Sequence, residues 1–278
     1  MGMSPKGNID EDVVSGFGDE WQHFDRVDGA DYEKIFEDYF HIFPWDSVSP
    51  DAEGFDLGCG AGPWAKFVSS RVKLLHCIDA SGEALQVARN NLRERRNVQF
   101  HHASVDAIPL PDSSQDFGYS LGVLHHVPDT AGGLRACVNK LKTEAPFLLY
   151  LYFAFDNKPR WYRWLWSLSE LVRKSVSRAP HPVRFAFSQA LAFTVYWPLS
   201  RLARILEKLG IGVDSVPLAY YRDKSMYAMR TAALDRFGTR LEQRFTKIEI
   251  EEMMRSVGLE RIIFSEKQPY WVALGYKA

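Results

Sequence analysis

The sequence predicts an α/β protein built on a seven-stranded, mostly parallel sheet with helices on both faces. Over residues 50–155, short apolar runs alternate with helical segments. Apart from the first, "DAEGFD", the runs are nearly continuously apolar, which is typical of strands in a parallel sheet that is covered on both sides. Two further apolar runs, "LERIIFSEK" and "YWVALGYKA", lie close enough in sequence to form an antiparallel pair.

Start and stop signals place helices between these runs. Ser81 is an N-cap candidate for the helix "SGEALQVARNNLRER", and "GGLRACVNKLK" is a helix that leads into the apolar run "FLLYLYFAF". Near the C-terminal end, Thr246 and Glu249 form a capping-box signature, and Gly258 supplies a stop. The remaining elements expected are a helix over residues 63–70 and strands in "DAEGFD", "VKLLHCID", "VQFHHAS" and "DFGYSLGVLHHV".

The alternation breaks down over residues 156–244, which we interpret as a helical insertion. This region is rich in aromatic residues and carries a net charge of +9, against −10 for the rest of the chain. It suits three roles, namely a lid, a substrate contact or an oligomer contact. The parts expected to form the main domain are residues 17–155 and 245–278, and residues 1–16 are polar and expected to be disordered.

Composition favours a soluble protein of the cytoplasm. The chain has 278 residues and only three cysteines, too few and too scattered for a disulfide framework or a cysteine-rich metal site. Its first residues lack the apolar core of a signal peptide. The uncharged run between Arg184 and Arg201 is shorter than the roughly 20 apolar residues of a membrane span, although it suits a helix at a membrane surface.

The stretch "FDLGCGAGPW" places Gly58, Gly60 and Gly62 directly after a predicted strand. Ordered glycines cost stability, so such a cluster indicates backbone that must pass close to a ligand. Ligands of open α/β sheets bind at the carboxyl ends of the strands, where this turn lies. The spacing disfavours a nicotinamide-dependent oxidoreductase, because Pro63 stands where the third glycine of the dinucleotide fingerprint is needed.

The spacing D-x-G-x-G-x-G resembles motif I of the class I S-adenosylmethionine-dependent methyltransferases. The chain is similar to their small-molecule branch, the ubiquinone- and menaquinone-methyltransferase-like type (methyltransferase type 11), over most of residues 50–155 and again over residues 245–278. The resemblance implies a Rossmann-like fold and S-adenosyl-L-methionine as the cofactor. It also implies that Asp56 faces the amino-acid end of the cofactor and that Asp79 pairs with its ribose hydroxyls.

Other segments match this family less closely. Ser104 stands where an aspartate often binds the adenine amino group, so its hydroxyl or the Val105 amide is expected to substitute. Trp21 and Phe24 precede the first strand, in a segment that often covers the cofactor. The full set of expected cofactor-binding residues is Asp56, Gly58, Cys59, Gly60, Gly62, Asp79, Ala80, Ser104, Val105, Asp106, Leu121, Gly122, Trp21 and Phe24.

His125 and His126, at the end of the fourth predicted strand, are the candidate catalytic residues. A hydroxyl nucleophile must lose its proton, and histidine has a suitable pKa near neutral pH. Adjacent strand residues face opposite ways, so at most one of the two is expected to point at the substrate. The alternative is that both are structural. No metal site is expected, because no His, Cys and carboxylate cluster has suitable spacing.

Aromatic and basic residues are the candidates for substrate binding. Arginine binds phosphate, sulfate or carboxylate as a fork, so an anionic small molecule is one candidate substrate. Amphipathic helices with Trp and Arg also suit an anionic membrane surface. The candidate substrate residues are Tyr220, Tyr221, Arg222, Tyr152, Trp161 and Tyr270.

Methyl transfer to oxygen of a hydroxylated intermediate, such as a sugar or a natural-product precursor, is the function we expect. One alternative is C-methylation of a quinone or phenol lipid near the membrane, and another is a non-catalytic protein that keeps the fold. Nucleic acid is not an expected partner, because no RNA-binding module accompanies the basic region. A homodimer is compatible with the sequence.

Overall fold

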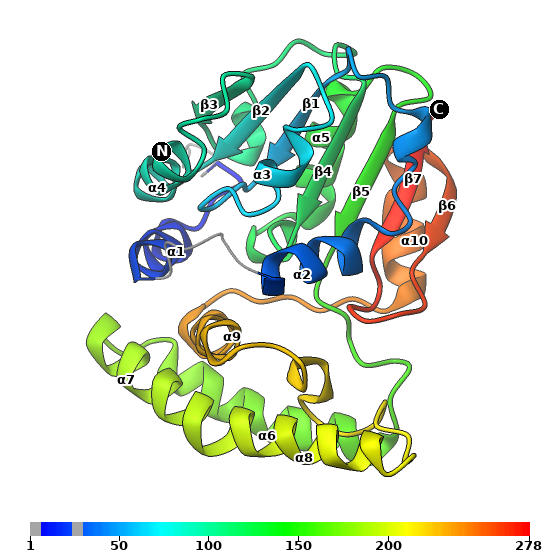
Figure 1. Ribbon diagram of the computed structural model, residues 1–278. Helices are drawn as coiled ribbons and strands as arrows, with labels where there is room; N and C mark the ends of the chain where they lie inside the picture. Colours follow the sequence, from blue (N-terminus) through cyan, green and yellow to red (C-terminus); the bar gives the residue numbers. More distant parts are fainter. Residues whose placement is uncertain (1–6, 24–29) are drawn as a thin grey trace, which may run out of the picture. The chain divides into compact units, whose positions relative to one another are not determined.

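The computed structural model describes residues 7–23 and 30–278, which form two compact units. Residues up to 154 together with residues 241–278 form the sheet unit, and residues 155–240 form the helical unit (Figure 1). Residues 241–244, which we expected within the insertion, lie in the sheet unit, because the backbone of Leu241 and Gln243 is hydrogen-bonded to His126 and His125, which follow β4.

The sheet unit contains the predicted seven-stranded sheet. Its strand order is β3-β2-β1-β4-β5-β7-β6, and β7 is antiparallel to both of its neighbours, while β1 to β5 are parallel. The fold prediction is therefore confirmed. The strands are β1 (Glu53–Leu57), β2 (Leu74–Asp79), β3 (Val98–His102), β4 (Phe117–Leu121), β5 (Pro146–Tyr150), β6 (Leu259–Phe264) and β7 (Ala273–Lys277).

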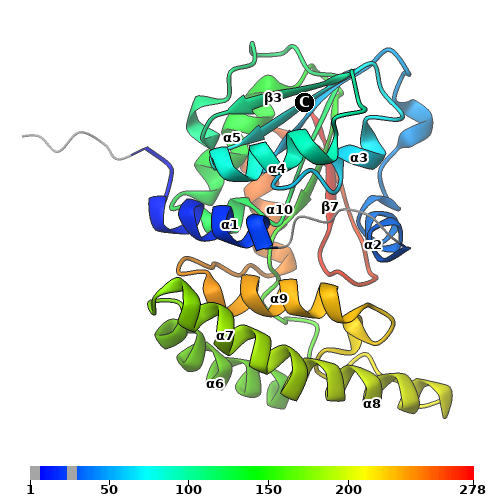
Figure 2. The same ribbon diagram turned by 60° about the vertical axis from the view of Figure 1, so that its left-hand side comes forward.

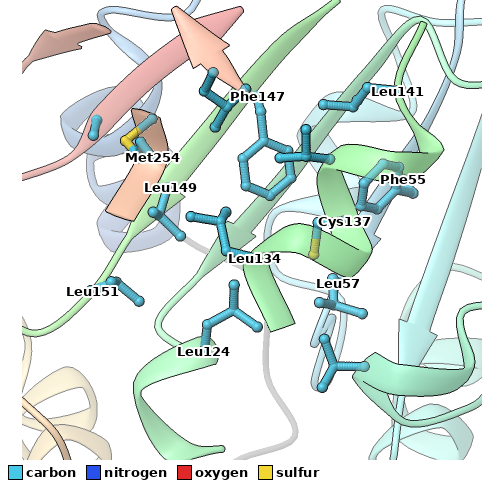
Figure 3. Close-up of a cluster of buried hydrophobic side chains, with 14 of the residues drawn as sticks. Phe55, Leu57, Leu124, Leu134, Cys137, Leu141, Phe147, Leu149, Leu151 and Met254 are labelled. Atoms are coloured by element: carbon cyan, nitrogen blue, oxygen red, sulfur yellow. The ribbon is translucent and has the colours of Figure 1, made fainter. Parts of the chain in front are cut away.

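Helices cover both faces of the sheet. The α-helices of this unit are α1 (Glu11–His23), α2 (Ala30–Phe40), α3 (Ala65–Val68), α4 (Gly82–Asn91), α5 (Thr130–Lys140) and α10 (Lys247–Ser256). Side chains of α5 and α10, such as Leu134 and Met254, pack with Phe147 and Leu149 of β5 on one face (Figure 3). Side chains of α2, α3 and α4 form a second buried cluster on the other face.

The first strand is polar and glycine-containing in sequence, and the structure supplies the reason. A Cβ built on Gly54 would lie only 2.3 Å from the Phe117 ring of β4, so the glycine makes room for that ring. Gly118 of β4 makes room for Phe55 in the same way. These reciprocal contacts bury both rings completely, which compensates for the weak strand propensity of the segment.

The expectation of disorder over residues 1–16 is wrong for residues 11–16, because α1 begins at Glu11. The Asp10 carboxylate accepts the backbone N–H of Asp12 at 3.1 Å and of Val13 at 3.2 Å, as an N-cap does. Val13 is buried, and Gly18 packs closely on Ser81 at the start of α4. Capping and burial together order a segment that looks polar in sequence.

The helical unit consists of helices that enclose a small core of their own. They are α6 (Arg160–Val176), α7 (His181–Leu191), α8 (Trp197–Lys208) and α9 (Met226–Gly238), and a π-helical turn (Ala192–Tyr196) joins α7 to α8. Ala192, Met229 and Ala233 are completely buried in this core. None of the described helices combines the length and the apolar character that crossing a bilayer requires.

Thr246 closes the N-terminus of α10 with a complete capping box, as predicted. Its hydroxyl accepts the Glu249 N–H at 3.3 Å, and the Glu249 carboxylate accepts the Thr246 N–H at 2.7 Å. We expect Thr246→Ala to lower the free energy of unfolding by about 1 kcal/mol, since the hydroxyl that accepts the Glu249 N–H is lost. Urea denaturation measures this, with Ser256→Ala at the other end of the helix as the control. Equal stability of the two variants would contradict the capping role.

Candidate functional site

The glycine turn leaves β1 at its carboxyl end in a conformation that other residues rarely adopt. Gly58, Gly60 and Gly62 have φ angles of +76°, +53° and +80°, so each lies in the left-handed region that glycine tolerates without strain. The N–H groups of Gly58 and Cys59 donate to the carbonyl oxygen of Ile78 on β2, at 2.7 Å and 3.1 Å. The turn is therefore fastened to the neighbouring strand.

Asp79, the last residue of β2, ties the ends of the first two strands together. Its Oδ2 accepts the Gly60 N–H at 2.9 Å, and its Oδ1 accepts the Ser81 N–H at 2.8 Å. Burial raises the pKa of this carboxyl above its usual value, although the two N–H donors oppose the rise. Ala80 follows, and its carbonyl oxygen lies 2.9 Å from the Nε2 of His102.

Asp56 is buried in the middle of the sheet. It stands opposite Cys77 of β2 and Tyr119 of β4, so the three side chains share the face covered by α2, α3 and α4. Burial raises the pKa of Asp56 to about 8, and the Tyr119 hydroxyl partly opposes this rise. Within the described residues, its Oδ2 has no hydrogen-bond partner. Such a buried oxygen is costly unless a ligand or a proton satisfies it.

Gly122 directly follows β4 and borders open space. Its φ is +80°, and a Cβ built on it would meet no atom of the described residues within 4 Å. The three glycines of the turn differ from it, since a Cβ there would meet a neighbouring side chain at less than 3 Å. The end of β4 is therefore the place where the glycine conformation leaves room for a ligand, while the preceding Leu121 is buried in the core.

The segment expected to lie along the adenine carries a short hydrogen-bonded chain. The Ser104 hydroxyl donates to Oδ1 of Asp106 at 2.5 Å, and the N–H of Asn8 donates to its Oδ2 at 3.0 Å. The Ser104 bond and the Asn8 bond lower the pKa of Asp106, although its partial burial opposes them. Val105, between Ser104 and Asp106 in the chain, is buried. The Ser104 hydroxyl is thus oriented by the carboxylate that follows it.

Helix α1 lies against the glycine turn through Trp21, whose expected role of covering the cofactor stays a prediction. The Trp21 indole lies against Gly60, where its ring atoms would be 2.7–2.9 Å from an added Cβ. One helical turn earlier, the Phe17 ring lies 5.1 Å from the His126 ring, measured between centroids. Phe24, the second residue of the expected pair, lies outside the described residues.

The two histidines do not alternate across a strand, so that part of the prediction is wrong. Strand β4 ends at Leu121, and Leu124–His126 form a 3₁₀ turn, whose tight winding brings both rings to one place. The His125 ring centroid lies 4.0 Å from that of His126 and 3.8 Å from that of Tyr152, which follows β5. Both histidines and Tyr152, an expected substrate residue, therefore belong to one cluster.

The environments of the two imidazoles differ. His125 is completely buried, and neither ring nitrogen has a hydrogen-bond partner within the described chain. Burial first, and then His126 and Arg244, lower its pKa well below the usual value, so the ring is neutral at physiological pH. The Nδ1 of His126 donates to the Leu241 carbonyl oxygen at 2.7 Å. In the neutral ring this leaves the lone pair on Nε2.

The segment 241–245 completes this cluster, and sequence reasoning missed it. The N–H of Gln243 donates to the His125 carbonyl oxygen at 3.0 Å, and its side-chain amide donates to that of Val127 at 2.8 Å. Arg244 donates to Oε1 of Glu242 at 2.8 Å and lies 5.0 Å above the Tyr152 ring. Nothing in the charged stretch "LEQRF" marks it as part of this cluster, because a surface loop would have the same composition.

The other expected substrate residues are divided between the two units. Tyr270, in the sheet unit, contacts the rings of Phe153 and Trp271. Trp161, Tyr220, Tyr221 and Arg222 lie in the helical unit. There, the Arg222 guanidinium donates two hydrogen bonds to the Glu207 carboxylate, at 2.9 Å and 2.8 Å. The substrate roles of these residues stay predictions.

Comparisons with known proteins agree with the geometry of the sheet unit. Residues 55–149 match the family described as "Methyltransferase domain". A Bacillus subtilis protein described as an uncharacterized methyltransferase is 32% identical over 104 residues, which are 37% of this chain and 41% of that protein. The ubiquinone biosynthesis O-methyltransferase of Nitrosomonas europaea is 26% identical over 167 residues, or 59% of this chain and 67% of that protein.

A solved structure shares the fold. It is a chain from the complex between the Haloferax volcanii Trm112 methyltransferase activator and a methyltransferase. The superposition covers 94% of this chain and 96% of that chain, with a TM-score of 0.51 and 15% sequence identity. At this identity the likeness concerns the fold alone. The family match lies entirely within the sheet unit, where the glycine turn and Asp79 are found.

The buried Asp56 carboxyl predicts an unusual dependence of stability on pH. Because its pKa is raised from 3.8 to about 8, the folded protein keeps a proton that the unfolded chain has lost between these values. Stability should therefore fall as the pH rises through this window. We expect Asp56→Asn to reduce the loss of Tm between pH 5 and pH 7.5, while the exposed Asp51→Asn leaves it unchanged. An Asp56→Asn variant with the wild-type pH profile would contradict the assignment.

Proposed function

We propose that this chain is a class I S-adenosylmethionine-dependent methyltransferase and that it methylates oxygen on a hydroxylated small molecule, which its fold and its domain match support. The proposal has two parts, the place of the cofactor and the nature of the acceptor. The observation that carries the second part is the completely buried His125, whose ring nitrogens have no partner among the described residues.

The residues at the carboxyl ends of β1, β2 and β4 fit S-adenosylmethionine. Asp79 offers a carboxylate for the ribose hydroxyls, and Asp56 has a buried oxygen that accepts no hydrogen bond from the described residues. The space beside Gly122 supports its expected place among the cofactor-binding residues. When bound, the cofactor supplies a methyl group on a positively charged sulfur, and the task of the protein is to align an acceptor with it.

His125 suits the removal of a proton from a hydroxyl. A buried imidazole without partners costs free energy, which a bound acceptor would recover by donating a hydrogen bond to it. Its lowered pKa keeps the ring neutral, so a ring nitrogen has a lone pair for the hydrogen bond from the acceptor hydroxyl. In the proposed step, His125 would take the proton of the acceptor hydroxyl, and the bound cofactor would supply the methyl group.

The neighbours of His125 would hold it in place for this step. The Tyr152 ring packs on one side of the His125 ring, and the Gln243 N–H donates a hydrogen bond to the backbone carbonyl oxygen of His125. Arg244 and Glu242 form an ion pair beside this cluster, so the charge of Arg244 is balanced there. The similarity to ubiquinone biosynthesis O-methyltransferases supports a phenolic hydroxyl as one acceptor class.

Gly122→Ala tests the cofactor site. Because its Cβ would enter the space assigned to the cofactor, we expect the Kd for S-adenosylhomocysteine to rise about tenfold or more, since an extra methyl in a filled site costs about 1–3 kcal/mol. Isothermal titration calorimetry measures this. Gly258→Ala is the matched control, because Gly258 also has a left-handed φ, +89°, and open space around it. Equal affinity of the two variants would refute the placement.

His125→Asn tests whether His125 removes the proton of an acceptor hydroxyl. We expect kcat to fall about 100-fold to 10,000-fold, the usual contribution of a general base, with the Kd for S-adenosylhomocysteine unchanged. The assay follows S-adenosylhomocysteine release with 3,4-dihydroxybenzoate and methyl glucoside as probes. His41→Asn, at an exposed histidine, is the control.

Three results would contradict the proposal of O-methylation. One is an unchanged kcat in His125→Asn, and another is a product whose NMR spectrum shows the methyl group on carbon. The third is a protein that binds S-adenosylhomocysteine but turns over none of the hydroxylated probes. In that case the cofactor assignment stands and the acceptor class is wrong.

A further inference from the structure

The helical unit exposes an unusual amount of apolar surface. Of the large hydrophobic side chains that are exposed in the described chain, all but two, Ile248 and Ile263, lie between residues 161 and 211. Scattered single hydrophobic residues are normal on a protein surface, but a contiguous group marks an interaction site. The question is therefore what covers this group.

Helix α6 carries the first part of the group as a continuous stripe. Its inward face includes the buried Arg173, while its apolar residues point outward at helical spacing. Trp164 is 66% exposed and Leu171 is 64% exposed. The stripe consists of Trp161, Trp164, Leu165, Leu168, Leu171 and Val172. This is the reverse of an ordinary surface helix, which turns its apolar face inward.

Helix α8 and the residues flanking it carry the second part. Ile205 is 57% exposed and Leu209, just after the helix, is 70% exposed, whereas Ala203 on the opposite face is completely buried. The exposed apolar residues here are Phe193, Val195, Trp197, Leu202, Ile205, Leu209 and Ile211. Helix α9 packs against α6 and α7, and in both views it lies on one side of the layer formed by α6, α7 and α8 (Figures 1 and 2).

Basic residues border both stripes. On α6, Arg160, Arg163 and Lys174 are exposed, and on α8, Arg204 and Lys208 are exposed. Each helix has a single acidic residue, and an arginine pairs with it. Arg173 binds Glu170 on α6, and Arg222 binds Glu207 on α8. Arg204 is paired with Asp223 at 3.6 Å, so the positive charge at the border of the stripes comes from Arg160, Arg163, Lys174 and Lys208.

This charge pattern indicates what kind of partner covers the apolar stripes. A second copy of the chain would bring another unit with a charge of about +9 against the first, and like charges repel. An anionic bilayer surface attracts such a border, and tryptophan side chains favour the interface between headgroups and acyl chains. No described helix can cross a bilayer, so the contact is with the surface of the membrane.

We propose that the stripes of α6 and α8 dock the helical unit on a membrane surface that contains anionic lipids. Leu, Ile and Trp side chains enter the headgroup region, and the bordering arginine and lysine residues bind lipid phosphates. This inference rests on the exposed side chains and their charges. It stands whether or not the acceptor of the methyl group is a lipid.

Vesicle sedimentation of the full chain tests the docking. The probes are vesicles of phosphatidylcholine alone and vesicles of phosphatidylcholine with one quarter phosphatidylglycerol. We expect the wild type to bind the anionic vesicles, more weakly as the salt concentration rises. The double variant Leu171→Glu/Ile205→Glu should weaken this binding about tenfold or more. Ile248→Glu should leave it unchanged, because Ile248, which is 67% exposed, lies on α10 of the sheet unit.

A second variant separates charge from apolar contact. Arg163→Glu/Lys174→Glu keeps the stripe of α6 but reverses its border, so it should weaken binding only to the anionic vesicles. Circular dichroism melting checks that each variant is folded. The proposal is overturned if the wild type ignores anionic vesicles at 0.15 M salt, or if the stripe variant binds them as well as Ile248→Glu does. A dimer that dissociates in Leu171→Glu/Ile205→Glu, without vesicle binding, would instead make this face a protein interface.

Discussion

The hydrogen bond from the Gly60 N–H to the Asp79 carboxylate organises the edge of the sheet at which the parallel strands have their carboxyl ends. It holds a turn of three left-handed glycines against the end of the neighbouring strand. Trp21 packs on the surface that Gly60 leaves bare, so helix α1 can lie over the strand ends. Any side chain at Gly60 would strain the turn and displace the indole at the same time.

Burial of polar groups is the second constraint on this edge. Asp56 and His125 are both enclosed, and desolvation acts on them in opposite directions, since it raises the pKa of the carboxyl and lowers that of the imidazole. Both groups are thereby driven to their uncharged forms. A hydrogen bond to a group enclosed in this way is stronger than in water, which suits the proposed alignment of an acceptor with the cofactor.

The two units differ in where their apolar side chains lie. The sheet unit encloses them on both faces of its sheet, and the family match falls within it. The helical unit has a small core and turns whole stripes of α6 and α8 outward. Our two proposals assign different roles to the units. The sheet unit would carry out methyl transfer, and the helical unit would bind the membrane surface at which it takes place.

The sequence by itself determined the seven-strand order of elements, the glycine turn, Asp79 and the capping box of Thr246, because each depends on spacing within a few residues. It could not place Glu242, Gln243 and Arg244 beside His125, since these residues are more than 100 positions away and their composition is that of a surface loop. It also misassigned the directions of His125 and His126, because the end of β4 is fixed by pairing with β1 and β5. Strand register and long-range packing decided those features, and such forces have no local signature in the chain.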